Sequence, residues 1–340
     1  MTNLIACNRD EIAAVLAPWV DRPFRLAQIA EWILSRHARS FDEMTDLPLE
    51  LRNSLDQRFS IQEPRVVDVH SSGDGCRKYL LELDDRATVE CVAMPGRGKL
   101  SLCLSSQTGC ALGCTFCVTG ALGAGRNLSA EEIVGQYRMM LRHSEVGPER
   151  VNLVFMGMGE PLLNTAHLER ALRVFYERVS PRRITISTAG LVPGIRWFAG
   201  LDQPPKLALS LNAPDQERRA AIMPVARRYP LDQLMAELRA LPLARGRRIT
   251  FEYVLIRGFN DQAADALAVA SLLRGIPAKV NLIPLNPDAT HIPAFQPPDP
   301  EVVDIFGQTL RSAHFAVTVR NSRGQDVAGA CGQLRARVVG

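Results

Sequence analysis

The chain is 340 residues long, carries a formal net charge of +4 and contains eight cysteines. It shows no secretory leader and no apolar run near the roughly 18 residues of a membrane span, so we expect a cytoplasmic protein without a membrane partner. In that reducing compartment cysteines serve packing or chemistry, which excludes a disulfide-stapled fold. The small positive charge is compatible with a nucleic-acid partner but does not establish one.

Two short segments precede the main body of the chain. The spacing of apolar residues between Arg9 and Phe59 is helical, and the next segment reads as short strands separated by turns. The expected elements are helices near 24–33 and 47–59, then strands at 66–70, 77–83 and 88–94. We therefore divide this part into a helical accessory module, residues 1–62, and a short antiparallel β extension, residues 63–98.

From residue 99 to residue 340 the patterns of strand and helix alternate regularly. Strands are expected at 100–105, 151–156, 183–188, 206–211, 248–256, 278–283 and 315–320, with helices at 130–143, 166–179, 193–199, 231–240, 261–274 and 300–313. This alternation indicates an α/β fold with parallel strands joined by right-handed crossovers. A partial (β/α)6-type barrel is favoured over a doubly wound sheet, because no G-x-G-x-x-G motif follows the first strand.

Three cysteines crowd the loop after the first of these strands. Cys110, Cys114 and Cys117 are spaced C-x3-C-x2-C, which suits three irons of a 4Fe-4S cluster and leaves the fourth open for reaction. Structural zinc usually takes four ligands in two pairs, and no second C-x2-C or histidine pair follows, so zinc is the weaker alternative. A loop after a barrel strand lies on the face where barrel enzymes carry their chemistry.

Polar and glycine residues follow the later strands at equivalent positions. Gly159 and Glu160 follow the second strand, where a close backbone approach and a carboxylate suit a ligand with an ammonium group. The third, fourth and sixth strands end at Ser187, at Ser210-Leu211-Asn212 and at Asn286. Each is an ordinary turn signal alone, but together on the rim with the cysteines they predict a cofactor site.

Two further cysteines stand apart from this loop. Cys103 lies in the strand seven residues before Cys110, and Cys331 is flanked by glycines in the polar segment 326–333. A lone cysteine is usually a packing residue. The surroundings of Cys331 instead predict a mobile and reactive thiol.

Taken together, the motifs resemble a known family. The C-x3-C-x2-C loop followed by Gly-Glu is similar to the radical S-adenosylmethionine (SAM) superfamily. Further segments closely resemble the RlmN/Cfr family of adenosine methyltransferases: Cys103, Gly157-Met-Gly-Glu-Pro-Leu162, Ile186-Ser-Thr188, Glu252-Tyr-Val-Leu255, Gly258-Phe-Asn-Asp261, Val280-Asn-Leu-Ile-Pro284 and Ala330-Cys-Gly-Gln-Leu334. The resemblance implies an enzyme that methylates an adenine carbon of large-subunit rRNA and, in some members, of tRNA.

The resemblance also implies cofactors, partners and the residues that hold them. The cofactors would be a 4Fe-4S cluster and SAM, two molecules per turnover. The residues implied are Cys110, Cys114 and Cys117 for the cluster, Gly159 and Glu160 for the methionine end of SAM, and Ser187, Ser210, Leu211, Asn212 and Asn286 for the rest of SAM. Partners would be RNA, bound by the accessory module, and a flavodoxin-like or other one-electron donor, and we expect a monomer.

The implied reaction uses the two isolated cysteines. The amidine carbon of adenine is electron-poor, so polar methyl transfer from SAM does not reach it, whereas a radical does. Cys331 would take a methyl group from one SAM, and a 5′-deoxyadenosyl radical from the second SAM would abstract hydrogen from that methyl group. After addition to adenine, Glu90 would accept the ring proton and Cys103 would release the product by forming a disulfide with Cys331.

Two alternatives remain beside methylation at carbon 2. Asn212 stands where many family members have His, and Ala124-Gly125 replaces a bulkier pair, so the expected pocket shape does not decide the substrate. Methylation at carbon 8 would use the same cysteines. A non-catalytic Fe-S protein that binds RNA or senses iron is the alternative from another class, and it would need the cluster but not both Cys103 and Cys331.

Overall fold

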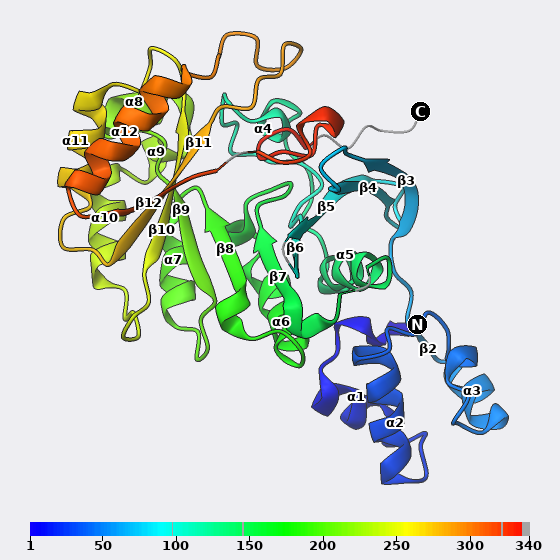
Figure 1. The fold of residues 1–340 in the computed structure, drawn as a ribbon. Coiled ribbons are helices and arrows are strands. Elements are labelled where there is room, and N and C mark those ends of the chain that lie inside the picture. Colours follow the sequence, from blue (N-terminus) through cyan, green and yellow to red (C-terminus); the bar gives the residue numbers. More distant parts are fainter. Residues whose placement is uncertain (97, 145, 321, 335–340) are drawn as a thin grey trace.

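One large sheet carries ten strands, β3 to β12, in the order of the sequence (Figure 1). The computed structural model describes residues 1–96, 98–144, 146–320 and 322–334. Within them the sheet consists of β3 (Arg65–Ser71), β4 (Arg77–Glu82), β5 (Thr88–Gly96), β6 (Lys99–Cys103), β7 (Val151–Phe155), β8 (Ile184–Thr188), β9 (Lys206–Ser210), β10 (Ile249–Leu255), β11 (Ala278–Pro284) and β12 (Ala316–Val319). The strands β3 and β12 form its two edges, so the sheet is open.

The strands from β6 to β12 are parallel to one another. Their crossovers contain α5 (Ala130–Arg142), α6 (Thr165–Tyr176), α7 (Val192–Ala199), α10 (Leu231–Ala240), α11 (Ala263–Leu272) and α12 (Pro300–Ser312). Because each crossover adds the next strand on the same side, the sheet is wound in one direction and its helices cover the outer face (Figure 1). The prediction of an α/β fold with a partial barrel is confirmed. The predicted β extension, β3 to β5, continues the same sheet through antiparallel pairing with β6.

Three short helices were not predicted from the sequence. They are α4 (Val118–Ala121), α8 (Gln216–Ile222) and α9 (Val225–Arg228). Each spans two turns or fewer, too little for a helical period to emerge from the sequence. A start signal was present for α8, since Asp215 caps it by accepting a hydrogen bond from the Arg218 amide at 2.9 Å. Single 3-10 turns complete the described elements: η1 (Leu4–Ala6), η2 (Phe41–Glu43), η3 (Pro148–Arg150), η4 (Pro161–Leu163), η5 (Pro181–Arg183) and η6 (Gln325–Val327).

The N-terminal segment holds three α-helices where the sequence pattern predicted two. These are α1 (Arg9–Leu16), α2 (Pro23–Leu34) and α3 (Leu49–Asp56), and a parallel pair of two-residue strands, β1 (Thr2–Asn3) with β2 (Phe59–Ser60), closes the segment. The segment packs on α5 of the barrel through Arg138, whose side chain is only 2% exposed. This guanidinium donates to the carbonyls of Ile33 and Ala38 and pairs with Glu63 at 2.6 Å. The apolar residues of the helices and of the barrel form one continuous core.

The segment after β12 returns across the sheet to the cysteine loop. Its first anchor is the turn between β3 and β4, where Asp326 accepts hydrogen bonds from Ser72 Oγ at 2.6 Å and from the Gly73 amide at 3.1 Å. Its second anchor is α4, since the Val118 amide donates to the carbonyl of Gly332 at 2.8 Å. Figure 1 shows this segment in red beside α4. The chain therefore delivers Cys331 to the carboxyl edge of the parallel strands.

Candidate active site

A cleft of about 1040 Å³, partly open to solvent, lies at the carboxyl ends of the parallel strands. Its walls come from the cysteine loop, from the ends of β7 to β11 and from the C-terminal segment. The predicted site residues that line it are Cys110, Cys114, Cys117, Gly159, Glu160, Ser187, Ser210, Asn212, Asn286 and Cys331. Segments far apart in the sequence meet here because parallel strands end at one edge of the sheet.

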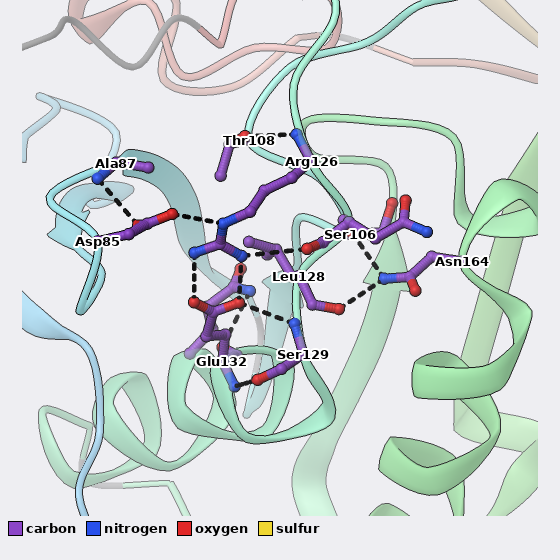
Figure 2. Close-up of polar contacts among 11 residues, drawn as sticks. Asp85, Ala87, Ser106, Thr108, Arg126, Leu128, Ser129, Glu132 and Asn164 are labelled. Carbon is purple, nitrogen blue, oxygen red and sulfur yellow. Dashed lines mark hydrogen bonds and ion pairs between the residues drawn. The ribbon is translucent and has the colours of Figure 1, made fainter.

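The cysteine loop is clamped at its base by Arg126 (Figure 2). The Arg126 amide donates to Thr108 Oγ1, and the Thr108 amide donates back to the Arg126 carbonyl, each at 3.0 Å. The guanidinium bonds Asp85, in the turn between β4 and β5, at 2.6 Å, and both carboxylate oxygens of Glu132 on α5 at 2.7 and 2.8 Å. Such bidentate pairing fixes the orientation of both partners, so the loop is tied to two neighbouring elements.

A second clamp joins the two arms of the loop. The buried side chain of Asn164 donates to the carbonyls of Ser106 and Leu128 at 2.9 and 2.8 Å (Figure 2). Nearby the arms touch backbone to backbone, since a Cβ added to Gly125 would lie 2.4 Å from the Gly109 amide nitrogen. Any side chain at Gly125 would force the arms apart, so this close approach requires glycine.

The three clustered thiols line the cleft from the cysteine loop. Burial raises the pKa of Cys110 to about 11, and burial with the nearby thiolates of Cys117 and Cys110 raises the pKa of Cys114. A coordinated metal supplies the positive charge that deprotonates such thiols. Among the described residues, no three His, Cys, Asp or Glu side chains converge as ligands for a single metal ion. A cubane cluster needs a wider arrangement, because each cysteine binds a different iron.

Glu160 places a buried carboxylate in the wall of the cleft. Its Oε1 accepts a hydrogen bond from the Leu162 amide at 3.0 Å, and its Oε2 accepts one from the Ala189 amide at 2.8 Å. Burial raises the pKa of Glu160 to about 7, and these backbone donors partly offset that rise. The preceding Gly159 adopts φ +94°, and a Cβ there would meet Gln107 at 2.5 Å. The Gly-Glu pair thus holds a titratable carboxylate in a fixed position.

The other predicted SAM-site residues differ in how they face the cleft. Ser187 and Ser210 line it from the ends of β8 and β9, whereas Leu211 is fully buried in the core. Asn212 lines the cleft, but its Oδ1 accepts a hydrogen bond from the Val254 amide at 2.9 Å. Asn286 donates to the Cys331 carbonyl at 3.0 Å, so in this structure its side chain also holds the C-terminal segment.

A second cavity, of about 970 Å³, adjoins the first below the C-terminal segment. Cys103 lines it from the end of β6, and Cys331 lines both cavities. Burial and the neighbouring Cys331 thiolate raise the pKa of Cys103 to about 12. All eight cysteines are free thiols, so no disulfide is formed between Cys103 and Cys331 in this structure. The predicted thiol pair therefore shares one cavity in the reduced state.

Glu90 lies on β5, the strand that also supplies Met94 and Gly96 to this cavity. It is 4% exposed and pairs with Lys78 Nζ at 3.0 Å. Two residues further along β5, Val92 pairs with Cys103 in the antiparallel register of β5 and β6. The described lining of the two cavities does not include Glu90.

Four residues of the site were not singled out as site residues in the sequence. Met156 lines both cavities, Arg320 lines the second, and Glu252 lines the first from β10. The fully buried Arg219 on α8 donates to the carbonyls of Ala189 and Ser210 at 2.6 and 3.2 Å, which joins the ends of β8 and β9. Met156 and Arg320 could have been found because they directly follow β7 and β12, whereas Glu252, in the middle of β10, and Arg219 had no such positional signal.

Two family models match this chain. Residues 2–61 match the ribosomal RNA large subunit methyltransferase N-terminal domain, and residues 104–269 match the radical SAM superfamily. A dual-specificity RNA methyltransferase RlmN from Anaeromyxobacter sp. (strain Fw109-5) is 44% identical over 337 residues, which cover 96% of this chain and 89% of the relative. The chain belongs to the RlmN family of radical SAM enzymes. A probable RlmN from Thermus thermophilus is likewise 44% identical, over 93% of this chain and 90% of the relative.

A solved structure agrees with this membership of the RlmN family. The crystal structure of a radical SAM methyltransferase from Sphaerobacter thermophilus superposes with a TM-score of 0.92 at 40% identity, covering 99% of this chain and all of the other. Membership implies a 4Fe-4S cluster and SAM as cofactors, and three thiols on one loop beside an open cleft fit a cluster with three protein ligands. No helix in the described ranges is both long and apolar enough to span a bilayer.

Proposed function

We propose that this enzyme methylates carbon 2 of an adenosine in large-subunit rRNA and also acts on tRNA. The observation that carries the proposal is the position of Cys331, which borders both the cleft of the clustered thiols and the cavity of Cys103. A thiol at that junction is accessible to SAM on one side and to a second thiol on the other. This is the placement that a methyl-carrying cysteine requires.

The clustered thiols and the Gly-Glu pair form the cofactor site of this proposal. Cys110, Cys114 and Cys117 ligate the 4Fe-4S cluster, which when bound supplies the electron that cleaves SAM to a 5′-deoxyadenosyl radical. Glu160 pairs with the SAM ammonium group, and Gly159 keeps the backbone close enough for that contact. Ser187, the segment 210–212 and Asn286 complete the pocket, with Leu211 contributing through its backbone.

The two isolated thiols divide the group transfer between them. Cys331 accepts a methyl group from one SAM and carries its carbon to adenine. A second SAM supplies the radical that activates this methyl group, so each turnover uses two SAM molecules. The thiolate of Cys103 then attacks the sulfur of Cys331, and the bond between that sulfur and the new methylene group breaks with its electron pair on the carbon. That carbon takes up a proton and becomes the methyl group, while the two sulfurs form a disulfide. Glu90, held by Lys78, accepts the proton from the adenine ring.

The partners follow from the same chemistry. A flavodoxin-like or other one-electron donor reduces the cluster, and the helical module 1–62 contacts the RNA. The enzyme acts as a monomer in the cytoplasm. Size-exclusion chromatography with light scattering tests the oligomeric state. The mass of a dimer at micromolar protein concentration would contradict the monomer.

Nucleoside analysis tests this function directly. The rRNA and tRNA of cells lacking the protein, complemented with wild type or with Cys331→Ala, would be digested and analysed by mass spectrometry. We expect 2-methyladenosine in both RNAs with wild type and in neither with the variant. A product methylated at carbon 8 would establish the alternative position. Unmodified RNA in the wild-type strain would contradict the proposal and favour a non-catalytic role.

A further inference from the structure

The edge of the sheet opposite the cleft is strongly basic. Lys99 is the first residue of β6, Lys206 is the first residue of β9, and Lys279 is the second residue of β11. Arg183 directly precedes β8, and Arg247 lies two residues before β10. Parallel strands begin at one edge, and the register places Lys206 opposite Thr185 and Lys279 opposite Thr250. We call these five residues the basic rim. It contains three of the four lysines in the chain.

These charges lack counter-charges in the described part of the chain. Lys99 and Lys206 are exposed and the other three are half-buried, yet no ion pair joins any of the five to an acid there. Elsewhere some surface arginines are paired, as Arg170 is with Glu131 at 3.0 Å, and exposed arginines without a described ion pair, such as Arg227, lie apart from this edge. The rim is set apart by the clustering of five such cations at one edge of the sheet.

The rim charges repel one another. Burial lowers the pKa of Lys206, and the positive charges of Lys279, Arg247, Lys99 and Arg183 lower it further. The adjoining surface cavity adds Arg182 and Arg248 and a single acid, Asp202, to Lys206 and Arg247. Concentrated like charge destabilises a fold unless an anion binds there.

The rim and the cleft share one face of the sheet. Side chains alternate along a strand, so Lys99 lies on the same face as Ser101 and Cys103, and Lys206 lies on the same face as Ser210. Ser101 and Cys103 line the second cavity, and Ser210 lines the cleft. At about 3.3 Å per residue, the four steps from Lys99 to Cys103 span roughly 13 Å, and Ser101 between them is half-buried and lines the second cavity. An extended RNA strand of a few nucleotides bridges such a distance.

We propose that the basic rim binds the phosphodiester backbone of the substrate RNA, on nucleotides that flank the one held in the cleft. This inference rests on the proposed function, which makes RNA the substrate. Lysine and arginine side chains bind nucleic acid mainly through phosphates, and they fix its register without reading sequence. An acidic electron donor fits less well, because the rim lies at the opposite ends of the strands from the clustered thiols.

Charge removal gives the first test. The triple variant Lys99→Ala, Lys206→Ala, Lys279→Ala is compared with Arg227→Ala, Arg274→Ala, Arg311→Ala, which removes three exposed charges from α9, from the turn after α11 and from α12. RNA affinity is measured over a range of salt concentrations. For the rim variant we expect weaker binding and a slope of log K against log salt shallower by about 2, as expected for three lost phosphate contacts on a single strand. The control variant keeps the wild-type slope.

Two readouts separate this inference from the proposed function. Methyl transfer from SAM to Cys331 without RNA should be unchanged in the rim variant. If the wild-type enzyme methylates RNA but the rim variant keeps the wild-type salt slope, the rim proposal alone is overturned. If that variant instead loses only its reduction by an acidic donor protein, the rim binds a protein and not RNA.

Lysine footprinting tests the contact in the wild-type holoenzyme, without any substitution. Sulfo-NHS-acetate acylates accessible lysines, and mass spectrometry quantifies each site with and without substrate RNA. Protection is expected at Lys99, Lys206 and Lys279, while the buried, ion-paired Lys78 serves as an internal control that reacts in neither case. Equal acylation of the three rim lysines with and without saturating RNA overturns the proposal.

Discussion

Glu160 is a carboxyl group whose ionisation the protein has shifted into the physiological range. Two backbone amides hold its oxygens toward Leu162 and Ala189, so the side chain has little freedom to leave the cleft. Burial raises its pKa to about 7, well above the ordinary value near 4.5. The group is therefore mostly neutral below pH 7 and mostly charged above it.

This shift predicts a pH dependence of SAM binding. The SAM ammonium group pairs with the carboxylate form, so affinity should rise as pH increases through about 7. Between pH 6 and pH 8 the ionised fraction, and hence affinity, should increase by about tenfold. Calorimetry on the cluster-loaded enzyme measures it, and Glu160→Gln should bind weakly with a flat profile. A flat profile in the wild type would show that Glu160 does not pair with the ammonium group.

For single residues, the sequence predicted which ones lie at the site better than it predicted the direction of their side chains. The positions of Ser187, Ser210 and Asn286 after their strands predicted that they lie together at the carboxyl edge of the sheet, and in the structure they line one cleft. The sequence did not reveal that Asn286 bonds the Cys331 carbonyl or that Leu211 points into the core. Side-chain direction depends on the local path of each loop and on long-range partners, neither of which strand periodicity encodes.

The cysteine loop owes its shape to contacts made outside the cysteines. Arg126 ties its base to α5 and to the turn between β4 and β5, and Gly109 and Gly125 let its arms touch. The sequence alone identified Gly125 as a departure from the family pattern. The structure supplies the physical reason that this position admits no side chain here.

Gly125→Ala should open the base of the loop. The new Cβ would lie 2.4 Å from the Gly109 nitrogen and 2.5 Å from Thr108 Oγ1, and such overpacking typically costs about 1–3 kcal/mol. We expect a lower thermal midpoint and incomplete iron uptake on reconstitution. Gly200→Ala is the matched control, because its nearest atom is an ordinary 3.5 Å away. Full iron content in Gly125→Ala would mean that the loop tolerates separation of its arms.

Among the helices and strands of the barrel, the short helices were the ones that the sequence did not predict. The seven parallel strands and the long crossovers were expected near the places where they are found, because burial imposes a clear period on them. The helices α8 and α9 are too short to show a period, yet α8 carries the Arg219 that joins two strand ends.

The N-terminal helices and the barrel share one core, so the molecule should unfold as a unit. The junction depends on Arg138, a buried cation held by Glu63 and by two carbonyls of the helical segment. The division of residues 1–62 from the barrel was predicted from sequence patterns, whereas this buried contact between them was not. An arginine on a helical pattern reads as a solvated residue unless its tertiary partner is known.

Arg138→Ala should lower the free energy of unfolding by about 1–3 kcal/mol, because the carbonyls of Ile33 and Ala38 lose their buried donor while Glu63 keeps its pair with Arg142. Urea denaturation followed by circular dichroism measures the change. As a control, Arg173→Ala removes exposed ion pairs with Glu11 and Glu169, and surface pairs of that kind each contribute less than about 1 kcal/mol. Equal stability of the two variants would mean that the contact with α5 does not hold the N-terminal helices.

The account depends most on the passage of the methyl carbon through Cys331 and on the release of the product by Cys103. Cys103→Ala, incubated with SAM, reductant and labelled RNA, should stop with RNA bonded to Cys331, because the thiolate that breaks that bond is missing. A denaturing gel should show a covalent protein–RNA adduct with this variant, and no adduct when Cys331→Ala is added to it. Methylated RNA released at the wild-type rate by Cys103→Ala, with no adduct, would contradict the account.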